Sequence, residues 1–273
     1  MLGAAQSRRS QLAAFFCLAY GISWALWLGL AVFSVSITTM VGAVVNVLAI
    51  AGPSIAALLI TLWLGRGRLR ELLAGLSVAR LSGPWLAVAL ILPPVLMCIA
   101  IAGSVVLLGA PRPHFGWSLV GVLAIEFVRV LFLGGPLGEE IGWRGFALPR
   151  LQQRRTALTS SVILGLVWGL WHIPLYFVPG TGQHEILRSG NDAAFSIGGF
   201  VTWTIGLSVL FTWLFNSSRG SLLVVIAFHT AVDLAAFLPG AVGSTGAAPV
   251  LNVVLTWLVA VVVILRYGRK TLS

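Results

Sequence analysis

The chain has 273 residues, of which 59% are hydrophobic and only 9% are charged. Soluble domains carry about 25% charged residues, so this composition excludes a soluble globular fold and indicates an integral membrane protein. The net charge of +10 could suggest a nucleic-acid-binding protein, but the placement of the basic residues argues against that function.

The chain is predicted to form one all-α membrane domain over residues 1–273, with about eight transmembrane helices. A membrane-crossing helix needs about 20 predominantly apolar residues. The stretches that meet this requirement are 12–34, 43–64, 85–109, 119–147, 159–178, 197–216, 221–239 and 248–266. The first stretch is too long for the apolar core of a cleaved signal peptide, so we expect an uncleaved first span.

Two segments depart from simple spans. Gly134-Gly135-Pro136 interrupts the fourth stretch, which predicts a kink or a restart of the helix at that point. Between the second and third spans, leucines at helical spacing alternate with arginines in residues 66–76. This pattern fits an amphipathic helix at the membrane interface, or an ordinary basic loop.

The basic residues are strongly biased to one side of the predicted topology. Fourteen of the 17 Lys and Arg residues lie at the ends and loops of that side. The positive-inside rule therefore places this side in the cytoplasm, and both termini with it. The positive charge is then a topology signal aided by anionic lipid, with no nucleic-acid partner. We expect a multi-pass protein of a bacterial plasma membrane, in contact with the lipid bilayer.

Eight ionisable residues lie inside the predicted spans, where such residues are costly and usually functional. They are Glu126, Arg129, Glu139, Glu140, Arg144, His172, His229 and Asp233. Glu126 and Arg129 are three residues apart and can neutralise each other, which favours a structural ion pair.

The adjacent carboxylates Glu139 and Glu140 are expected to differ in role. Glu140 precedes Arg144 by four residues, so these two side chains share a helix face and should pair. Glu139 points about 100° away and has Trp143 in the corresponding position, so it has no local counter-charge. An unpaired buried carboxylate suits a general base. The alternative is that both glutamates belong to a structural charge network.

Two of the four histidines lie deep in predicted spans, at depths close to that of Glu139. Glu139 is roughly 15 Å from the cytoplasmic end of its span at 1.5 Å per residue, His172 roughly 20 Å and His229 roughly 12 Å. Asp233 follows His229 by four residues on the same helix face. A lone membrane histidine more often bonds a neighbouring helix, but this constellation on three spans indicates a shared site.

A carboxylate beside two histidines suits the activation of water for hydrolysis. The site could hold a metal such as zinc, with His172, His229 and Asp233 as ligands and an open position for water. It could also be metal-free, with Glu139 activating water and His229 stabilising the oxyanion. The sequence has no G-x-S-x-G or HExxH motif, which argues against a serine-type mechanism.

Three motifs resemble those of the CAAX prenyl endopeptidases, also called the CPBP or Abi family. The sequence EEIGWR at 139–144 matches the EExxxR motif of that family. The sequences WGLWH, ending at His172, and HTAVD, beginning at His229, are similar to its aromatic-xxx-His and His-xxx-Asn/Asp motifs. The resemblance covers roughly residues 119–240, and it implies an eight-helix intramembrane endopeptidase with its catalytic core there.

The resemblance also implies a role for each motif residue. Glu139 and His172 would activate the water, and His229 and Asp233 would bind the oxyanion or complete the site. The remaining pair of the first motif, Glu140 and Arg144, would hold that motif in shape.

Two positions depart from the family pattern. Trp168 stands where Phe is common, and we expect this change to affect only the packing that supports the site. Asp233 stands where Asn is common in the prenyl-protein enzymes. An ionised Asp cannot donate a hydrogen bond to an oxyanion, but it is a good metal ligand. This departure favours a metal and weakens the transfer of a prenyl-protein substrate to this chain.

The main hypothesis is an intramembrane endopeptidase that cleaves a membrane-associated or lipidated protein or peptide. A proton-coupled transporter is the first alternative, because buried Glu and His residues also serve as proton relays. A non-catalytic membrane scaffold or immunity protein that retains the site is the second alternative. Peptide cleavage that depends on Glu139 separates the first hypothesis from the other two.

Overall fold

The computed structural model describes the backbone of residues 2–244 and 246–273, and the side chains of these residues from Ser10 onward. All regular structure within these ranges is helical, as the composition predicted. Seven helical segments are long and apolar enough to cross a membrane, and a bent pair of helices gives an eighth. The chain is therefore an all-α, multi-pass membrane protein.

The second predicted span is bent, which the sequence analysis did not anticipate. After α1 (Leu2–Val32), this span consists of α2 (Met40–Ile50) and α3 (Gly52–Leu64), which meet at 48°. Pro53 lies in the first turn of α3, and it has no N–H to donate to the carbonyl oxygen of Ala49. The hydroxyl of Ser23 donates to that oxygen instead, at 2.7 Å. The bend is thus stabilised by a contact from α1.

The basic segment that follows is helical, so it is not an irregular loop, and its position at a membrane interface stays a prediction. Helix α4 (Arg66–Leu73) continues into a short 3-10 turn at Ala74–Leu76, and Leu72 is buried. A second 3-10 turn, Val78–Arg80, leads into the long helix α5 (Gly83–Leu108).

The fourth span is broken at the predicted place. Helix α6 (Ser118–Leu133) ends at the glycine pair, and the chain resumes as α7 (Pro136–Glu140), the π-helix η3 (Ile141–Ala147) and α8 (Leu148–Gln152). Gly135 has φ of +135°, a conformation that side-chain-bearing residues rarely adopt. A Cβ atom at position 135 would also lie 2.6 Å from Oε1 of Glu139. Glycine is therefore required there for the backbone and for the carboxylate.

The second half of the chain contains the remaining spans. These are α9 (Ala157–Trp171) with the 3-10 turn η4 (Ile173–Phe177), α11 (Ala193–Ser217), α12 (Leu222–Ala241) and α13 (Ala248–Tyr267). A short helix, α10 (Gly182–Arg188), lies in the loop between α9 and α11. The hydropathy pattern did not predict it, because it is too short and polar to register as a span.

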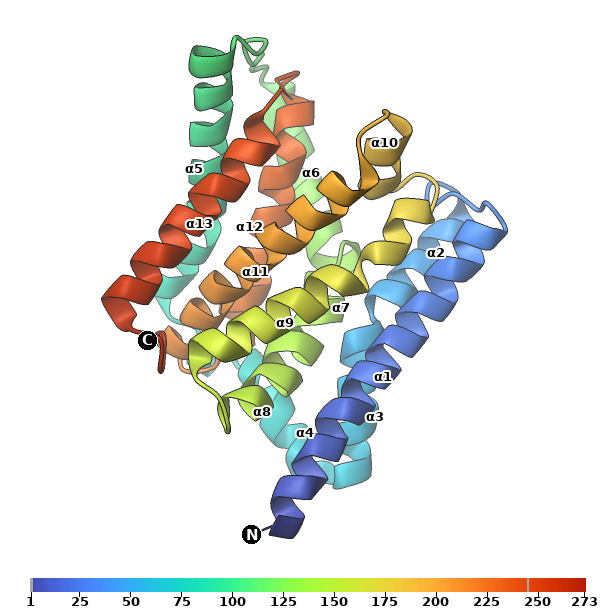
Figure 1. The fold of residues 1–273 in the computed structure, drawn as a ribbon, viewed down its shortest axis with the longest axis vertical. Helices are drawn as coiled ribbons and strands as arrows, with labels where there is room; N and C mark the ends of the chain where they lie inside the picture. Colours follow the sequence, from blue (N-terminus) through green and yellow to red (C-terminus); the bar gives the residue numbers. More distant parts are fainter. Residues whose placement is uncertain (1, 245) are drawn as a thin grey trace.

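Some helices pack against the next span of the chain, and others pack against spans that are distant in sequence (Figure 1). Helices α9 and α11 run side by side across the middle of the bundle, and α1 packs against α3 on one flank. On the other flank, α5 packs with α12 and α13. Helix α6 packs mainly on α12 and α7, so it forms an outer wall of the bundle.

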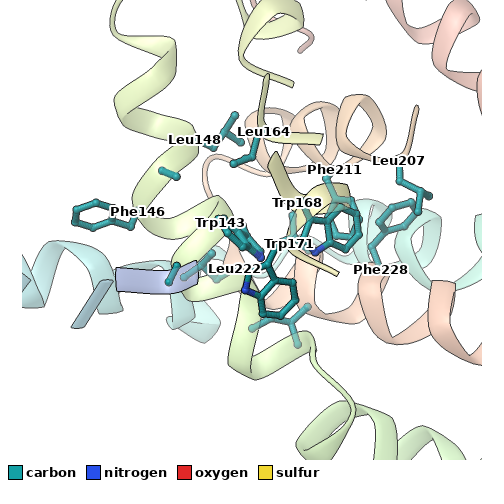
Figure 2. Packing of buried hydrophobic residues seen from close by; sticks show 14 of the residues in the cluster. Trp143, Phe146, Leu148, Leu164, Trp168, Trp171, Leu207, Phe211, Leu222 and Phe228 are labelled. Carbon is teal, nitrogen blue, oxygen red and sulfur yellow. The ribbon is translucent and has the colours of Figure 1, made fainter. Parts of the chain in front are cut away.

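Buried aromatic rings surround the broken span (Figure 2). Trp143 of η3 packs edge-on against Trp171 of α9, with ring centroids 5.8 Å apart, and against Phe15 of α1 at 5.4 Å. Trp168 of α9 packs against Phe211 of α11 at 5.6 Å. Large, shape-specific rings of this kind restrict movement of the elements that carry them. The motif residues are therefore held on a rigid scaffold.

Candidate active site

A cavity of about 440 Å³ lies between α2, α6, α7, α9, α11 and α12. Its walls include Glu139, His172, His229 and Asp233, the four residues predicted to carry the chemistry. The proximity expected from their depths in separate spans is thus found in the structure. Their chemical roles stay predictions.

Glu139 accepts a hydrogen bond from a residue that was expected to matter only for packing. Its side chain is at the end of α7 and is only 3% exposed. The indole Nε1–H of Trp168 donates to Oε2 of Glu139 at 2.6 Å. The expectation for Trp168 was therefore too narrow. Phe has no N–H, so the departure from the family pattern at this position adds a hydrogen-bond donor to the carboxylate.

His172 is oriented by the same residue through its backbone. His172 directly follows the last residue of α9, and the α-helix ends there, two residues before Pro174. Its Nδ1–H donates to the carbonyl oxygen of Trp168 at 2.8 Å. A carbonyl oxygen only accepts, so in the neutral ring Nε2 carries the lone pair. Trp168 thus contacts both Glu139 and His172, and Nε2 of His172 is available to the cavity.

Glu140 is the centre of a buried charge cluster. Its Oε1 accepts from Nη1 of Arg144 at 2.8 Å, which confirms the predicted pair, and both side chains are 0% exposed. The same oxygen also accepts from Nδ1 of His229 at 2.7 Å. The guanidinium of Arg144 lies over the rings of Trp168 and Phe211, at 4.6 Å and 3.8 Å from their centroids. Glu140 therefore links the first motif to the third.

The link between Glu140 and His229 was missed by the sequence analysis. Spacing within one helix reveals pairs such as Glu140 with Arg144. Glu140 and His229 are separated by 89 positions, and only the packing of α12 against α7 brings them together.

His229 lies between two carboxylates. Nδ1 of His229 is hydrogen-bonded to Glu140. The other ring nitrogen, Nε2, lies 3.8 Å from Oδ2 of Asp233. That separation is too long for a direct hydrogen bond. The Asp233 side chain is 33% exposed and lines the cavity. The structure thus places an imidazole and a carboxylate on the cavity wall contributed by α12.

The predicted metal-ligand set is not assembled in this arrangement. Among the described residues, no group of three or more His, Cys, Asp or Glu side chains is placed to hold a metal ion. His172 and His229 each have one ring nitrogen bound to an oxygen acceptor, as metal-bound histidines do. The set of His172, His229 and Asp233 nevertheless does not converge on one point. The residues as arranged do not fit a three-ligand zinc site.

The fold and the site together define a class: a multi-pass membrane protein with a Glu and His cavity inside its helix bundle. Comparison with known proteins agrees with the resemblance seen in the three motifs. Residues 120–235 match the family model of the type II CAAX prenyl endopeptidases, Rce1-like. The matched region contains all four candidate catalytic residues.

A curated protein of the same kind is also similar to this chain in sequence. The chain is similar to the CAAX prenyl protease 2 of Methanococcus maripaludis, with 32% identity over 148 residues. The aligned region is 54% of this chain and 51% of the relative, so the chain spans about half the length of the curated relative it matches.

Proposed function

We propose that this protein is an intramembrane endopeptidase that hydrolyses a peptide bond of a membrane-associated or lipidated protein or peptide. The observation that carries the proposal is that Glu139, His172, His229 and Asp233 line the same cavity. The likeness of residues 120–235 to the type II CAAX prenyl endopeptidases supports the same reaction class.

Glu139 and His172 are proposed to activate the attacking water. Water held between the Glu139 carboxylate and Nε2 of His172 loses a proton to Glu139, and its oxygen attacks the carbonyl carbon of the peptide. Trp168 supports this assignment because it orients both groups, through its indole N–H and its carbonyl oxygen. Fixed orientation of this kind is a large part of general base catalysis.

His229 is proposed to stabilise the oxyanion that this attack creates. Its Nδ1–H is held by Glu140, so donation to the oxyanion requires that Nε2 carries a proton as well. Glu140 and Asp233 on either side favour that positively charged ring. When the intermediate collapses, the C–N bond breaks and Glu139 returns its proton to the leaving amine. The products are a carboxylic acid and an amine, and the side chains return to their starting state.

Zinc takes no step in this proposal, because the predicted ligands are not gathered around one point. Glu140 and Arg144 also take no direct part. They position His229 and the π-helix, in agreement with the structural role predicted for them.

The decisive experiment compares the proteomes of membranes that contain the native protein or its Glu139→Gln variant. We expect new peptide termini only with the native protein, because Gln keeps the shape of Glu but cannot act as a base. Glu71→Gln is the matched control, because Glu71 is exposed and lies outside the cavity. Identical termini in all three membranes would contradict the proposal. Proton flux without cleavage in reconstituted vesicles would instead support the transporter alternative.

A further inference from the structure

A second cavity, of about 500 Å³, lies at the end of the bundle where α1 begins (Figure 1). Its walls come from α1, α3, α4 and α8, from the 3-10 turn Val78–Arg80 and from the loop between α11 and α12. The four candidate catalytic residues line the other cavity and not this one. The proposed peptidase reaction therefore leaves this second cavity unexplained.

Three arginines meet at this cavity from segments that are far apart in the chain. Arg68 comes from α4, Arg80 from the 3-10 turn and Arg150 from α8. Among the described residues of the cavity wall, Glu71 is the only carboxylate, and it pairs with Arg68 at 2.8 Å. Positive charge is thus in excess here. The positive-inside rule accounts for basic residues on this side of the membrane, but it does not require that they gather around one cavity.

The side chain of Arg80 has no protein partner that explains its position. Within the described part of the chain, its guanidinium takes part in no hydrogen bond or ion pair. Its Nη1 lies next to the loop between α11 and α12, 3.6 Å from the point where a Cβ atom at Gly220 would be. Arg150 is fixed in a different way. Its Nη1 donates to the carbonyl oxygen of Phe146 at 3.0 Å, and its guanidinium lies 3.5 Å from the centroid of the Phe146 ring.

The chemistry of these arginines suits a phosphate group. Guanidinium groups bind phosphate oxygens through parallel N–H donors, and the delocalised charge of Arg is weakly hydrated. Basic pockets between transmembrane helices are a recurrent type of site for the headgroups of anionic lipids.

The position of the cavity favours a lipid as the source of the phosphate. The last turn of α3 carries the exposed apolar side chains of Leu62 and Trp63, and α4 begins with Arg66 directly beyond it. An exposed tryptophan at a change from apolar to basic side chains is typical of the membrane–water interface. Leu64, from the same turn, lines the cavity. A headgroup in the cavity would therefore leave its acyl chains beside the apolar surface of α3.

We propose that this cavity binds the phosphate of an anionic phospholipid, with Arg80 and Arg150 as its principal ligands. On the predicted topology the lipid belongs to the cytoplasmic leaflet, which is the anionic one. Gly145 of the π-helix lines the same cavity, so the bound lipid also contacts the element that carries Arg144. The proposal goes beyond the endopeptidase function and does not depend on it.

The test uses the purified full-length protein in detergent and needs no peptide substrate. Dioctanoyl phosphatidylglycerol, dioctanoyl phosphatidylcholine and inorganic phosphate are titrated separately while the unfolding temperature is measured. A ligand that binds only the folded state raises this temperature by mass action. We expect a saturable rise with phosphatidylglycerol and little change with the other two at the same concentrations. Equal effects of the two lipids would overturn the proposal. Stabilisation by inorganic phosphate at the same concentrations would assign the cavity to free phosphate and overturn the lipid.

Variants of one arginine locate the binding. Arg80→Gln should raise the half-saturating concentration of phosphatidylglycerol by about tenfold or more, the range for loss of a hydrogen bond to a charged group. Arg80→Lys should show a smaller loss. Arg70→Gln is the matched control, because Arg70 is exposed on α4 and does not line the cavity. Equal losses in Arg70→Gln and Arg80→Gln would show only a general attraction of charges and would overturn the site.

A second variant keeps every arginine in place. Gln153→Glu adds a negative charge to the cavity wall, so it should weaken the binding of phosphatidylglycerol by repulsion. It replaces Arg80→Gln if that variant does not fold, which the unfolding temperature without lipid reveals. Unchanged lipid affinity in Gln153→Glu would overturn the proposal.

Discussion

Glu139 and Glu140 are adjacent in the sequence, yet their carboxylates have different partners. Glu139 accepts from the neutral indole of Trp168, and Glu140 accepts from Arg144 and His229. The difference arises because successive residues of a helix point about 100° apart. One carboxylate therefore faces the cavity, and the other lies inside the charge cluster.

Replacement of Glu140 should act mainly on stability. We expect Glu140→Gln to destabilise the fold by about 3–5 kcal/mol, because Arg144 stays buried without its counter-charge. Glu139→Gln should leave the unfolding temperature close to that of the native protein while it abolishes hydrolysis. Thermal unfolding in detergent, with an activity assay on the same samples, measures both effects. Exchanged phenotypes of the two variants would show that the roles are assigned the wrong way round.

Trp168→Phe tests the hydrogen bond to the base. The variant keeps a ring beside Arg144 but loses the N–H that orients Glu139. We expect kcat to fall by about tenfold or more with KM little changed, as for loss of a hydrogen bond to a charged group. Steady-state kinetics with one peptide substrate measures the two constants. A rise in KM with unchanged kcat would assign Trp168 to substrate binding instead.

Asp233 distinguishes the metal-free mechanism from the predicted zinc site. We expect Asp233→Asn to keep or raise activity, because Asn adds a donor to the oxyanion and such donors are worth about 10²–10³-fold in rate elsewhere. Glu140, which is directly hydrogen-bonded to His229, still favours the charged ring in this variant. A chelator should then have no effect. Elemental analysis of the purified protein completes the measurement. The metal site would be established by three results together. These are stoichiometric zinc in the native protein, reversible inhibition by the chelator and loss of metal in the Asp233→Asn variant.

The broken fourth span shows how a backbone irregularity serves the site. Two glycines and Pro136 end α6 and restart the chain as α7, which carries Glu139 into the cavity. The π-helix that follows carries Arg144, and irregular turns of this type are frequent at functional sites. The break itself was predictable from the sequence, because glycine and proline interrupt helices for local reasons.

Gly135→Ala tests the required backbone conformation. We expect a loss of about 1–3 kcal/mol from the positive φ alone, and a loss of activity because the new methyl group displaces Glu139. Gly121→Ala is the control. Gly121 lies within α6 with open space around it, so alanine should be neutral or stabilising there. Unfolding temperatures and activities of both variants provide the comparison, and equal behaviour of the two would refute the role of Gly135.

The contacts between residues that are far apart in the chain could not be predicted from the sequence. Spacing along one helix was enough to predict the pairs of Glu140 with Arg144 and of Glu126 with Arg129. The bond from Trp168 to Glu139 joins positions 29 apart on different helices. Such contacts depend on how the helices rotate and pack, which periodicity does not determine. The bend at Ala51 was missed because this span was assigned from hydropathy alone, although Gly52-Pro53 is the same kind of helix-breaking pair as Gly135-Pro136.

For the whole molecule, hydropathy predicted the helical bundle because lipid requires helices with internally satisfied backbones. The orientation of the bundle is a separate prediction, which comes from the bias of the basic residues. We expect reporter fusions at Ser273 to be active only with reporters that function in the cytoplasm. Fusions in the loop between α5 and α6 should show the opposite behaviour. A periplasmic reporter that is active at Ser273 would contradict the eight-span topology.

Trp168 contacts the two halves of the water-activating pair in chemically different ways. Its side chain reaches Glu139, but its main-chain carbonyl orients His172. Any amino acid at this position supplies the carbonyl, whereas only one with a donor group supplies the contact to Glu139. A substitution at position 168, in natural or laboratory evolution, can therefore change the hydrogen bonding of Glu139 while His172 keeps its tautomer.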